Sequence, residues 1–364
     1  MMSAEVRVLF NVLNAPSTVQ QGQVIRKVIE SRGYKVQFKS SIGLPDIYNN
    51  SYRAYLWFTL PLVEFLVSDA PSWITARTKV NKPAVIYTTI EGIPKRANVL
   101  CSPLPNLEFV ANSKFTADML TEAGLKVIDV VHHGFDPEER DKALKTAHVV
   151  ASKWDAEFKG RCRIIYVGAN NPRKSLDKLS QAINIFNATH KDKAVFIIYS
   201  EPTAQQLFNQ ENVVVIPDFA KRPHLEVLRY MAAAHYFVWP SRCEGFGLPV
   251  LEANSLGRPA IHCMYPPLSE FTSEEFNFVW DYDDRVLVDT RLSQYYIFHD
   301  YPTEVLAEAL KDAVDTFFED RERYYEYCAK AKEHAEEWSC YKVYRKLLYY
   351  LGLDGGDVDA QDAD

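Results

Sequence analysis

Two glutamates, Glu244 and Glu252, stand on either side of a turn in the second half of the chain. Pro249 follows the turn and suits the first turn of a helix, where the missing N–H of proline costs nothing. The unpaired N–H groups at the start of such a helix bind anions. We therefore expect a phosphate at the helix start, with both carboxylates placed to accept hydrogen bonds from sugar hydroxyls. The turn itself consists of Gly245, Phe246, Gly247 and Leu248.

The elements that must position this turn can be read from the flanking residues. The apolar run 236–240 is typical of a short buried strand, and a helix is expected to begin at Pro249. An acid in the first turn of any helix is favoured by the macrodipole, which alone would explain Glu252. It does not explain Glu244, two nearby glycines and Pro249 together, so we interpret the segment as a ligand site.

The segment 241–261 resembles the E-x7-E region of retaining glycosyltransferases with the GT-B fold, the family 4 type that includes glycogen, sucrose and mannosyl transferases. The resemblance implies that Glu244 holds the donor sugar, that Glu252 holds the ribose, and that turn residues 245–248 hold the diphosphate. It also implies transfer of a hexose-type sugar from a nucleotide-diphosphate sugar to an acceptor hydroxyl with retained configuration. Neither a metal ion nor another cofactor is expected.

A basic loop follows the expected strand 163–167 and contains Arg173 and Lys174. Negative charge builds on a diphosphate leaving group, so cations there would stabilise the transition state. The resemblance assigns Lys174, and with it Arg173, to the diphosphate, and we group both with Glu244 as catalytic. Many relatives carry an arginine where this chain has Ala169, so the charge at the phosphate is lower or comes from Arg242 or another residue. A charged loop on a solvated surface is the alternative interpretation.

Other site residues are expected from the resemblance alone. Asp218 and Phe219 lie in a loop that would line the base and ribose pocket, although an ordinary β–α loop is an equal alternative. The first loop lacks the Gly-Gly pair common in relatives, and Ser17, Thr18 or Gly22 could substitute for it. His132 and His133 point to opposite faces of a strand and do not form a metal site. The candidates for the acceptor side are Ser17, Thr18, Thr89, Glu91 and His133.

The acidic pair Asp281 and Asp283 matches a D-x-D pattern that holds a metal in GT-A transferases. The pattern is short, occurs by chance, and follows the Glu244 turn instead of an early strand. We interpret it as an acidic loop without a metal.

Composition limits the class of protein. A chain of 364 residues with a net charge of −7 suits two globular domains and argues against a general nucleic-acid binder. Residues 1–160 carry a small basic excess, and the remainder is acidic. The six cysteines form no C-x-x-C pair. No apolar run approaches the ~20 residues of a membrane span, and the first residues do not read as a signal peptide. We expect a cytoplasmic protein, with peripheral membrane contact left open.

Alternating strand and helix patterns predict an α/β protein with parallel sheets. The resemblance implies a GT-B fold of two Rossmann-like domains facing across a cleft. We expect an N-terminal acceptor domain at 1–150, a linker near 143–160, a donor domain at 151–338, and a helix at about 339–351 that crosses back to the first domain. Residues 352–364 are acidic and glycine-rich and are expected to be disordered.

The partners expected are a nucleotide sugar and a glycan, lipid-linked or small-molecule acceptor. The donor base, the acceptor and the oligomeric state stay open. Rival functions are an epimerase or phosphorylase of the same fold and a degenerate protein that binds a nucleotide sugar or glycan without turnover.

Overall fold

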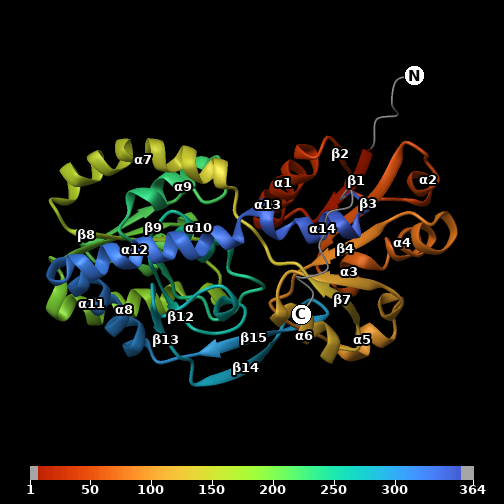
Figure 1. The fold of residues 1–364 in the computed structure, drawn as a ribbon. Coiled ribbons are helices and arrows are strands. Elements are labelled where there is room, and N and C mark those ends of the chain that lie inside the picture. The colour runs from red at the N-terminus through yellow and green to blue at the C-terminus, as the bar shows by residue number, and fades with distance from the viewer. Residues whose placement is uncertain (1–6, 354–364) are drawn as a thin grey trace. The chain divides into compact units, whose positions relative to one another are not determined.

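The computed structural model describes residues 7–353, which form two compact units, each built on a six-stranded parallel sheet (Figure 1). Unit 1 comprises the described residues up to Gly134, the segment Asp289–Tyr296 and the described residues from Cys340. Unit 2 comprises Phe135–Val288 and Ile297–Ser339. The prediction of an α/β protein with two Rossmann-like sheets is therefore confirmed.

The sheet of unit 1 has the strand order β2-β1-β3-β4-β6-β7. Every neighbouring pair in it is parallel. Its strands are β1 (Arg7–Val12), β2 (Lys35–Phe38), β3 (Tyr52–Thr59), β4 (Ala84–Thr88), β6 (Glu108–Ala111) and β7 (Lys126–Val130). Its helices are α1 (Pro16–Ser31), α2 (Leu44–Ile47), α3 (Val63–Leu66), α4 (Ala70–Thr75), α5 (Arg96–Leu100), α6 (Lys114–Glu122), α13 (Cys340–Val343) and α14 (Arg345–Tyr350).

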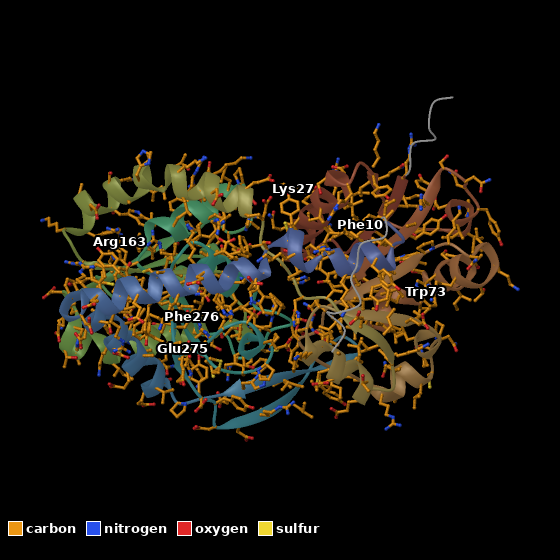
Figure 2. The ribbon with its side chains drawn as sticks, in the orientation of Figure 1. Phe10, Lys27, Trp73, Arg163, Glu275 and Phe276 are labelled. Atoms are coloured by element: carbon orange, nitrogen blue, oxygen red, sulfur yellow. The ribbon has the colours of Figure 1, made fainter. Side chains whose placement is uncertain are left out.

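The core of unit 1 forms where α1, α13 and α14 cover the sheet. Phe10 of β1, labelled in Figure 2, is fully buried and stacks on Phe38 at 5.2 Å between ring centroids. Gly22 allows α1 to pack tightly, because a Cβ there would lie 3.0 Å from Val12 Cγ2. The last helices contribute four buried side chains to this core, which are Tyr344, Leu347, Leu348 and Leu351.

The sheet of unit 2 has the order β10-β9-β8-β11-β12-β13, and its neighbouring pairs are also parallel. Its strands are β8 (Cys162–Val167), β9 (Ala194–Tyr199), β10 (Val213–Ile216), β11 (Tyr236–Trp239), β12 (Ala260–Cys263) and β13 (Phe278–Trp280). Its helices are α7 (Pro137–Phe158), α8 (Leu176–His190), α9 (His224–Ala233), α10 (Leu248–Ser255), α11 (Thr303–Glu319) and α12 (Arg321–Ala335).

The prediction of a linker at 143–160 is wrong, because α7 runs through most of it. Asp136 caps this helix by accepting hydrogen bonds from the backbone N–H groups of Glu138 and Glu139. Asp155 of α7 forms an ion pair with Arg163 of β8, which is labelled in Figure 2. The unit boundary consequently lies after Gly134, not at residue 150. Asp320 separates α11 from α12 and caps α12 by accepting a hydrogen bond from the backbone N–H of Arg323.

A short third sheet, with the order β14-β15-β5, was not expected from the sequence. Its strands are β5 (Gly92–Pro94), β14 (Asp284–Asp289) and β15 (Gln294–Asp300). Within unit 1, residues 294–296 pair antiparallel with β5. Gly92 is required there, because a Cβ would lie 1.9 Å from the carbonyl oxygen of Tyr295.

None of the helices in the described part of the chain is long and apolar enough to cross a bilayer. The expected disorder of the acidic tail concerns mainly residues 354–364, which lie outside the described residues.

Candidate functional site

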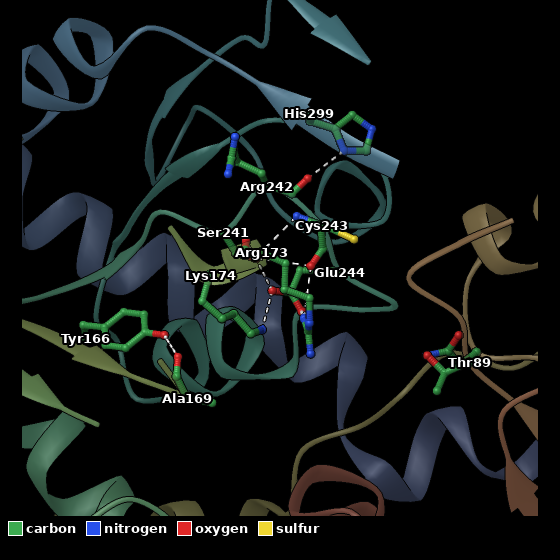
Figure 3. Close-up of polar contacts among 11 residues, drawn as sticks. Thr89, Tyr166, Ala169, Arg173, Lys174, Ser241, Arg242, Cys243, Glu244 and His299 are labelled. Carbon is green, nitrogen blue, oxygen red and sulfur yellow. Dashed lines mark hydrogen bonds and ion pairs between the residues drawn. The ribbon is translucent and has the colours of Figure 1, made fainter. Parts of the chain in front are cut away.

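The strand order of unit 2 places two loops next to each other at one edge of its sheet. β8 and β11 are neighbours, but the chain continues from β8 towards β9 on one side and from β11 towards β12 on the other. Such a topological switch point is where open α/β sheets bind ligands, at the carboxyl ends of the strands. The loop after β8 carries Arg173 and Lys174, and the loop after β11 carries Glu244 (Figure 3).

Hydrogen bonds between the two loops fix them to each other. The backbone N–H of Arg242 donates to the carbonyl of Arg173 at 2.9 Å. Arg242 Nε donates to Ser175 Oγ at 2.8 Å. The charged side chains of the site are therefore held on a braced backbone, which is the preorganisation that electrostatic catalysis requires.

Glu244 is buried at 6% exposure and has three polar partners. Its Oε1 accepts from Lys174 Nζ at 2.5 Å and from Ser241 Oγ at 2.5 Å, and its Oε2 lies 3.4 Å from Arg173 Nη1 (Figure 3). The structure thus brings together the three residues predicted to be catalytic. Ser241 joins them, although no motif in the sequence singled it out.

The charges of this cluster compensate each other. Burial alone would raise the pKa of Glu244, but the positive charges of Lys174 and Arg173 outweigh it and hold that pKa below its ordinary value. Lys174 is equally buried, and its Nζ lies 4.2 Å from the ring centroid of Trp239 in a cation–π contact. Glu244 is consequently a carboxylate at neutral pH, with a buried cation beside it.

The turn after Glu244 leads directly into the start of α10. Gly247 has φ of +96°, and a Cβ there would lie 2.2 Å from Leu268 Cδ2, so the position needs glycine. Without a side chain, Gly247 cannot cap the first amides of α10. Phe246 stacks on Phe271 at 4.7 Å and is buried, which means that it could serve a ligand only through its backbone. The helix begins at Leu248, one residue before the predicted start, with Pro249 in its first turn.

Glu252 lies in α10 and contacts His224, which in turn contacts Glu139. Sequence reasoning missed both His224 and Glu139. Glu252 Oε1 lies 3.1 Å from His224 Nε2, and His224 Nδ1 lies 3.0 Å from Glu139 Oε2. Burial would lower the pKa of His224, but Glu252 and Glu139 raise it to about 10. These three residues are separated by 85 and 28 positions, so only the fold brings them together.

The predicted base-pocket residues follow β10, on the same edge of the sheet. Asp218 forms an ion pair with Arg222 at 2.6 Å, and its backbone carbonyl accepts from Tyr199 Oη at 2.7 Å. Phe219 packs on Tyr199 with ring centroids 6.5 Å apart. The carboxylate of Asp218 is therefore already paired with Arg222, whereas the ring of Phe219 could stack on a base.

Arg242 was a candidate to supply the positive charge that relatives carry at the position of Ala169, but its guanidinium has other partners. Arg242 pairs with Asp300 at 3.1 Å, and its guanidinium lies 4.7 Å from the ring centroid of Phe298. The carbonyl of Ala169 accepts from Tyr166 Oη (Figure 3). The positive charge in contact with Glu244 comes from Arg173 and Lys174.

The residues predicted for the acceptor side all lie in unit 1. Ser17 is exposed in the first turn of α1, while Thr18 is buried and its hydroxyl donates to the carbonyl of Leu13 at 2.7 Å. Thr89 follows β4 and accepts from Asn112 Nδ2 at 3.0 Å. Glu91 is partly exposed just before β5.

His133 lies in the interior of unit 1. Its Nδ1 is 2.9 Å from Tyr87 Oη and 3.3 Å from Tyr344 Oη, and its ring packs edge-on against Phe58. Burial lowers its pKa to about 3, so the ring is neutral. These contacts favour a structural part for His133.

The D-x-D acids lie after β13 in unit 2. The backbone N–H of Asp283 donates to the carbonyl of Asp300 at 2.8 Å. Across residues 7–353, no group of three or more His, Cys, Asp or Glu side chains is arranged to hold a metal ion.

In sequence, the chain is similar to glycosyltransferases. A family model described as "Glycosyl transferases group 1" matches residues 161–290, which contain both loops of the site. A protein of Sulfolobus islandicus rod-shaped virus 1, named uncharacterized glycosyltransferase 335, is 29% identical over 301 residues, which cover 79% of this chain and 86% of the viral protein.

Two solved structures resemble the whole chain. A glycosyltransferase from Rickettsia africae is similar with a TM-score of 0.68 at 13% identity, covering 96% of this chain and 98% of its own. Anabaena HepE, solved in complex with UDP and glucose, is similar with a TM-score of 0.65 at 12% identity, covering 96% and 99%. At such low identity the likeness shows the fold, which is of the GT-B type. The family model and the viral relative support a glycosyltransferase.

Proposed function

We propose that this protein is a retaining glycosyltransferase that moves a hexose-type sugar from a nucleotide-diphosphate sugar to an acceptor hydroxyl without a bound metal ion. The observation that carries the proposal is the contact of Glu244 with Lys174 and Arg173 at the switch point of unit 2. Beside it lies the uncapped start of α10. The Glu244 turn and the basic loop both fall within the residues that the family model matches.

In this proposal, unit 2 binds the donor. The backbone of residues 245–248 and the start of α10 hold the diphosphate. Lys174 and Arg173 offset the negative charge that grows on the leaving diphosphate as the glycosidic bond breaks. Glu244 accepts hydrogen bonds from the sugar hydroxyls, and Glu252 accepts them from the ribose. Lys174 then lies between the Glu244 carboxylate and the diphosphate, and its positive charge stabilises both.

The chemical step is same-face substitution at the anomeric carbon. The bond from this carbon to the diphosphate oxygen breaks, and the bond to the acceptor oxygen forms on the same face. The acceptor proton passes to the departing phosphate. Glu244 orients the sugar and stabilises the positive charge on its ring, and it is not a nucleophile.

The acceptor would be bound by unit 1, with Thr89 and Glu91 as its leading candidates. Its hydroxyl belongs to a glycan, a lipid-linked sugar or a small molecule, and the reaction takes place in the cytoplasm or at its membrane surface. The complete set of Glu244, Lys174 and Glu252 argues against the rival of a degenerate binding protein.

A panel of UDP-, GDP- and ADP-sugars tests the proposal. Release of nucleoside diphosphate is measured with and without an acceptor, with and without EDTA, and the product is examined by NMR for its anomeric configuration. The expected result is turnover of one donor class that EDTA does not change, with retained configuration. Failure to bind or turn over any nucleotide sugar would overturn the proposal.

A further inference from the structure

His224 lies between carboxylates from two other helices of unit 2. Glu139 comes from the first turn of α7, His224 is the first residue of α9, and Glu252 comes from α10. All three side chains are less than a quarter exposed. Each ring nitrogen is within hydrogen-bond distance of one carboxylate, at 3.0 Å for Glu139 and 3.1 Å for Glu252.

Only one protonation state satisfies this arrangement. A carboxylate can accept but not donate, so both ring nitrogens must carry a proton, and only the imidazolium has two N–H donors. The pKa of His224, raised to about 10 by the two acids despite burial, agrees with this state. At neutral pH, therefore, a cation stands behind Glu252.

A cation at this point solves an electrostatic difficulty of the proposed donor site. Glu244 and Glu252 both flank the position assigned to a diphosphate, and their negative charges would repel it. Lys174 and Arg173 compensate Glu244, and His224 compensates Glu252. The imidazolium also restricts the carboxylate by binding Oε1, which leaves the acceptor capacity of Oε2 for a ligand.

We propose that His224 is a positioning residue for the donor nucleotide, which holds Glu252 ready to accept hydrogen bonds from the ribose hydroxyls and is itself held by Glu139. The inference rests on the proposed function, in which Glu252 binds the ribose. If His224 only stabilised the packing of α7 against α9, the contact with Glu139 would be sufficient. The contact with Glu252 links His224 to α10 as well, the helix whose Glu252 is proposed to bind the ribose.

Two substitutions separate these contacts. An asparagine places its amide nitrogen at the position of Nδ1, towards Glu139, whereas a glutamine reaches the position of Nε2, towards Glu252. His224→Asn thus keeps a donor for the structural contact and loses the positioning one, and His224→Gln does the reverse. Glu139→Gln serves as a third variant, because it leaves the contact between His224 and Glu252 in place.

The readout is the preference for ribose, measured by calorimetry. Binding of UDP, GDP and ADP to the wild-type protein identifies the base, and the 2′,3′-dideoxy analogue of that nucleotide is then compared. Hydrogen bonds to charged groups contribute enough for the wild type to bind the ribose form about tenfold more tightly or better. We expect His224→Asn to bind the ribose form about tenfold more weakly and to keep less than about a threefold preference. His224→Gln and Glu139→Gln should keep most of it.

A double-mutant comparison completes the test. If His224 acts through Glu252, adding His224→Asn to Glu252→Gln should not weaken ribose binding further. A His224→Asn variant with the full wild-type preference would overturn the inference. So would equal loss of preference in the Asn and Gln variants. Wild-type protein that binds no nucleoside diphosphate, or does not distinguish ribose, would instead overturn the donor-site assignment on which the inference rests. If His224→Asn does not fold, the Gln variants and Glu252→Gln decide the outcome.

Discussion

Lys174 Nζ lies 2.5 Å from Glu244 Oε1, and both residues are less than one-tenth exposed. The two residues are 70 positions apart and reach each other because β8 and β11 are neighbours at the switch point of unit 2. A buried ion pair seldom stabilises a fold by itself, since desolvation offsets most of its attraction. Its presence at a strand end is better explained by a ligand that both charges contact.

Lys174→Met tests the energetic side of this pair. Glu244 would remain buried with only Arg173 and Ser241 as partners, so unit 2 should lose about 2–4 kcal/mol of unfolding free energy. Adding Glu244→Gln should recover part of that loss, because no charge would then be uncompensated. Denaturant unfolding measures both, and Lys191→Met, on an exposed lysine, is the control with less than about 0.5 kcal/mol expected. Equal stability of the single and double variants would contradict the description of a compensated pair.

Gly247→Ala tests the turn that follows Glu244. The new Cβ would meet Leu268 Cδ2 at 2.2 Å in a left-handed backbone conformation, so both a clash and strain are introduced. Gly160 is the matched control, since its φ is +81° but nothing lies within 4 Å of a Cβ there. We expect Gly160→Ala to cost about 1–2 kcal/mol and Gly247→Ala clearly more, with loss of nucleotide binding only in the latter. Thermal unfolding and calorimetry provide the two measurements, and similar effects at both glycines would count against a built turn.

Buried neutral histidines predict a loss of stability in mild acid. Burial lowers the pKa of His133 to about 3 and that of His299 to about 4. It also lowers the pKa values of His235 and His262. Unfolded histidines take up protons near pH 6.5, which the folded ones resist. The stabilisation is thus present above pH 6.5 and is lost as pH falls towards 4, by up to about 1.4 kcal/mol per pH unit for each histidine.

His224 behaves in the opposite way. Its pKa is raised to about 10, so its contribution is complete below pH 6.5 and is lost as pH rises through 10. Unfolding free energies measured from pH 5 to 10.5 should therefore fall at both ends. His133→Gln should reduce the slope on the acid side, and His224→Gln the slope on the alkaline side. Unchanged slopes in both variants would contradict these protonation states.

Gly92→Ala tests the antiparallel pairing in unit 1. The Cβ would lie 1.9 Å from the carbonyl oxygen of Tyr295, so β5 and residues 294–296 could not keep their register. Hydrogen exchange of the Lys95 amide, which donates to the Ser293 carbonyl at 2.8 Å, should speed up at least tenfold. Gly33→Ala, with positive φ but open space, is the control. Wild-type protection in the Gly92 variant would show that the pairing is not maintained in solution.

The sequence was most informative where local pattern and chemistry coincide. Glu244, the glycine turn and Pro249 form one short segment, and the alternation of strands and helices predicted both parallel sheets. α7 was missed because its buried positions include small residues such as Ala143 and Ala147, which give a weak periodic signal. β14 was missed because it is almost wholly exposed, so its sequence lacks the alternation of buried and exposed residues that is typical of a strand.

The remaining part of the site depends on contacts that no local pattern encodes. His224 stands in a loop-like sequence, and its partners lie 85 residues before it and 28 residues after it. Asp218 is different, because its ion-pair partner Arg222 lies only four residues later in the chain.

Turnover by a Glu244→Gln variant tests the central claim most directly. The substitution keeps the size of the side chain and removes the charge that faces Lys174. On the donor identified with the wild type, and at a temperature where both proteins are folded, we expect nucleoside diphosphate release to fall at least about 100-fold, with nucleotide affinity little changed. Turnover at the wild-type rate would contradict the assignment of Glu244 to the reacting sugar.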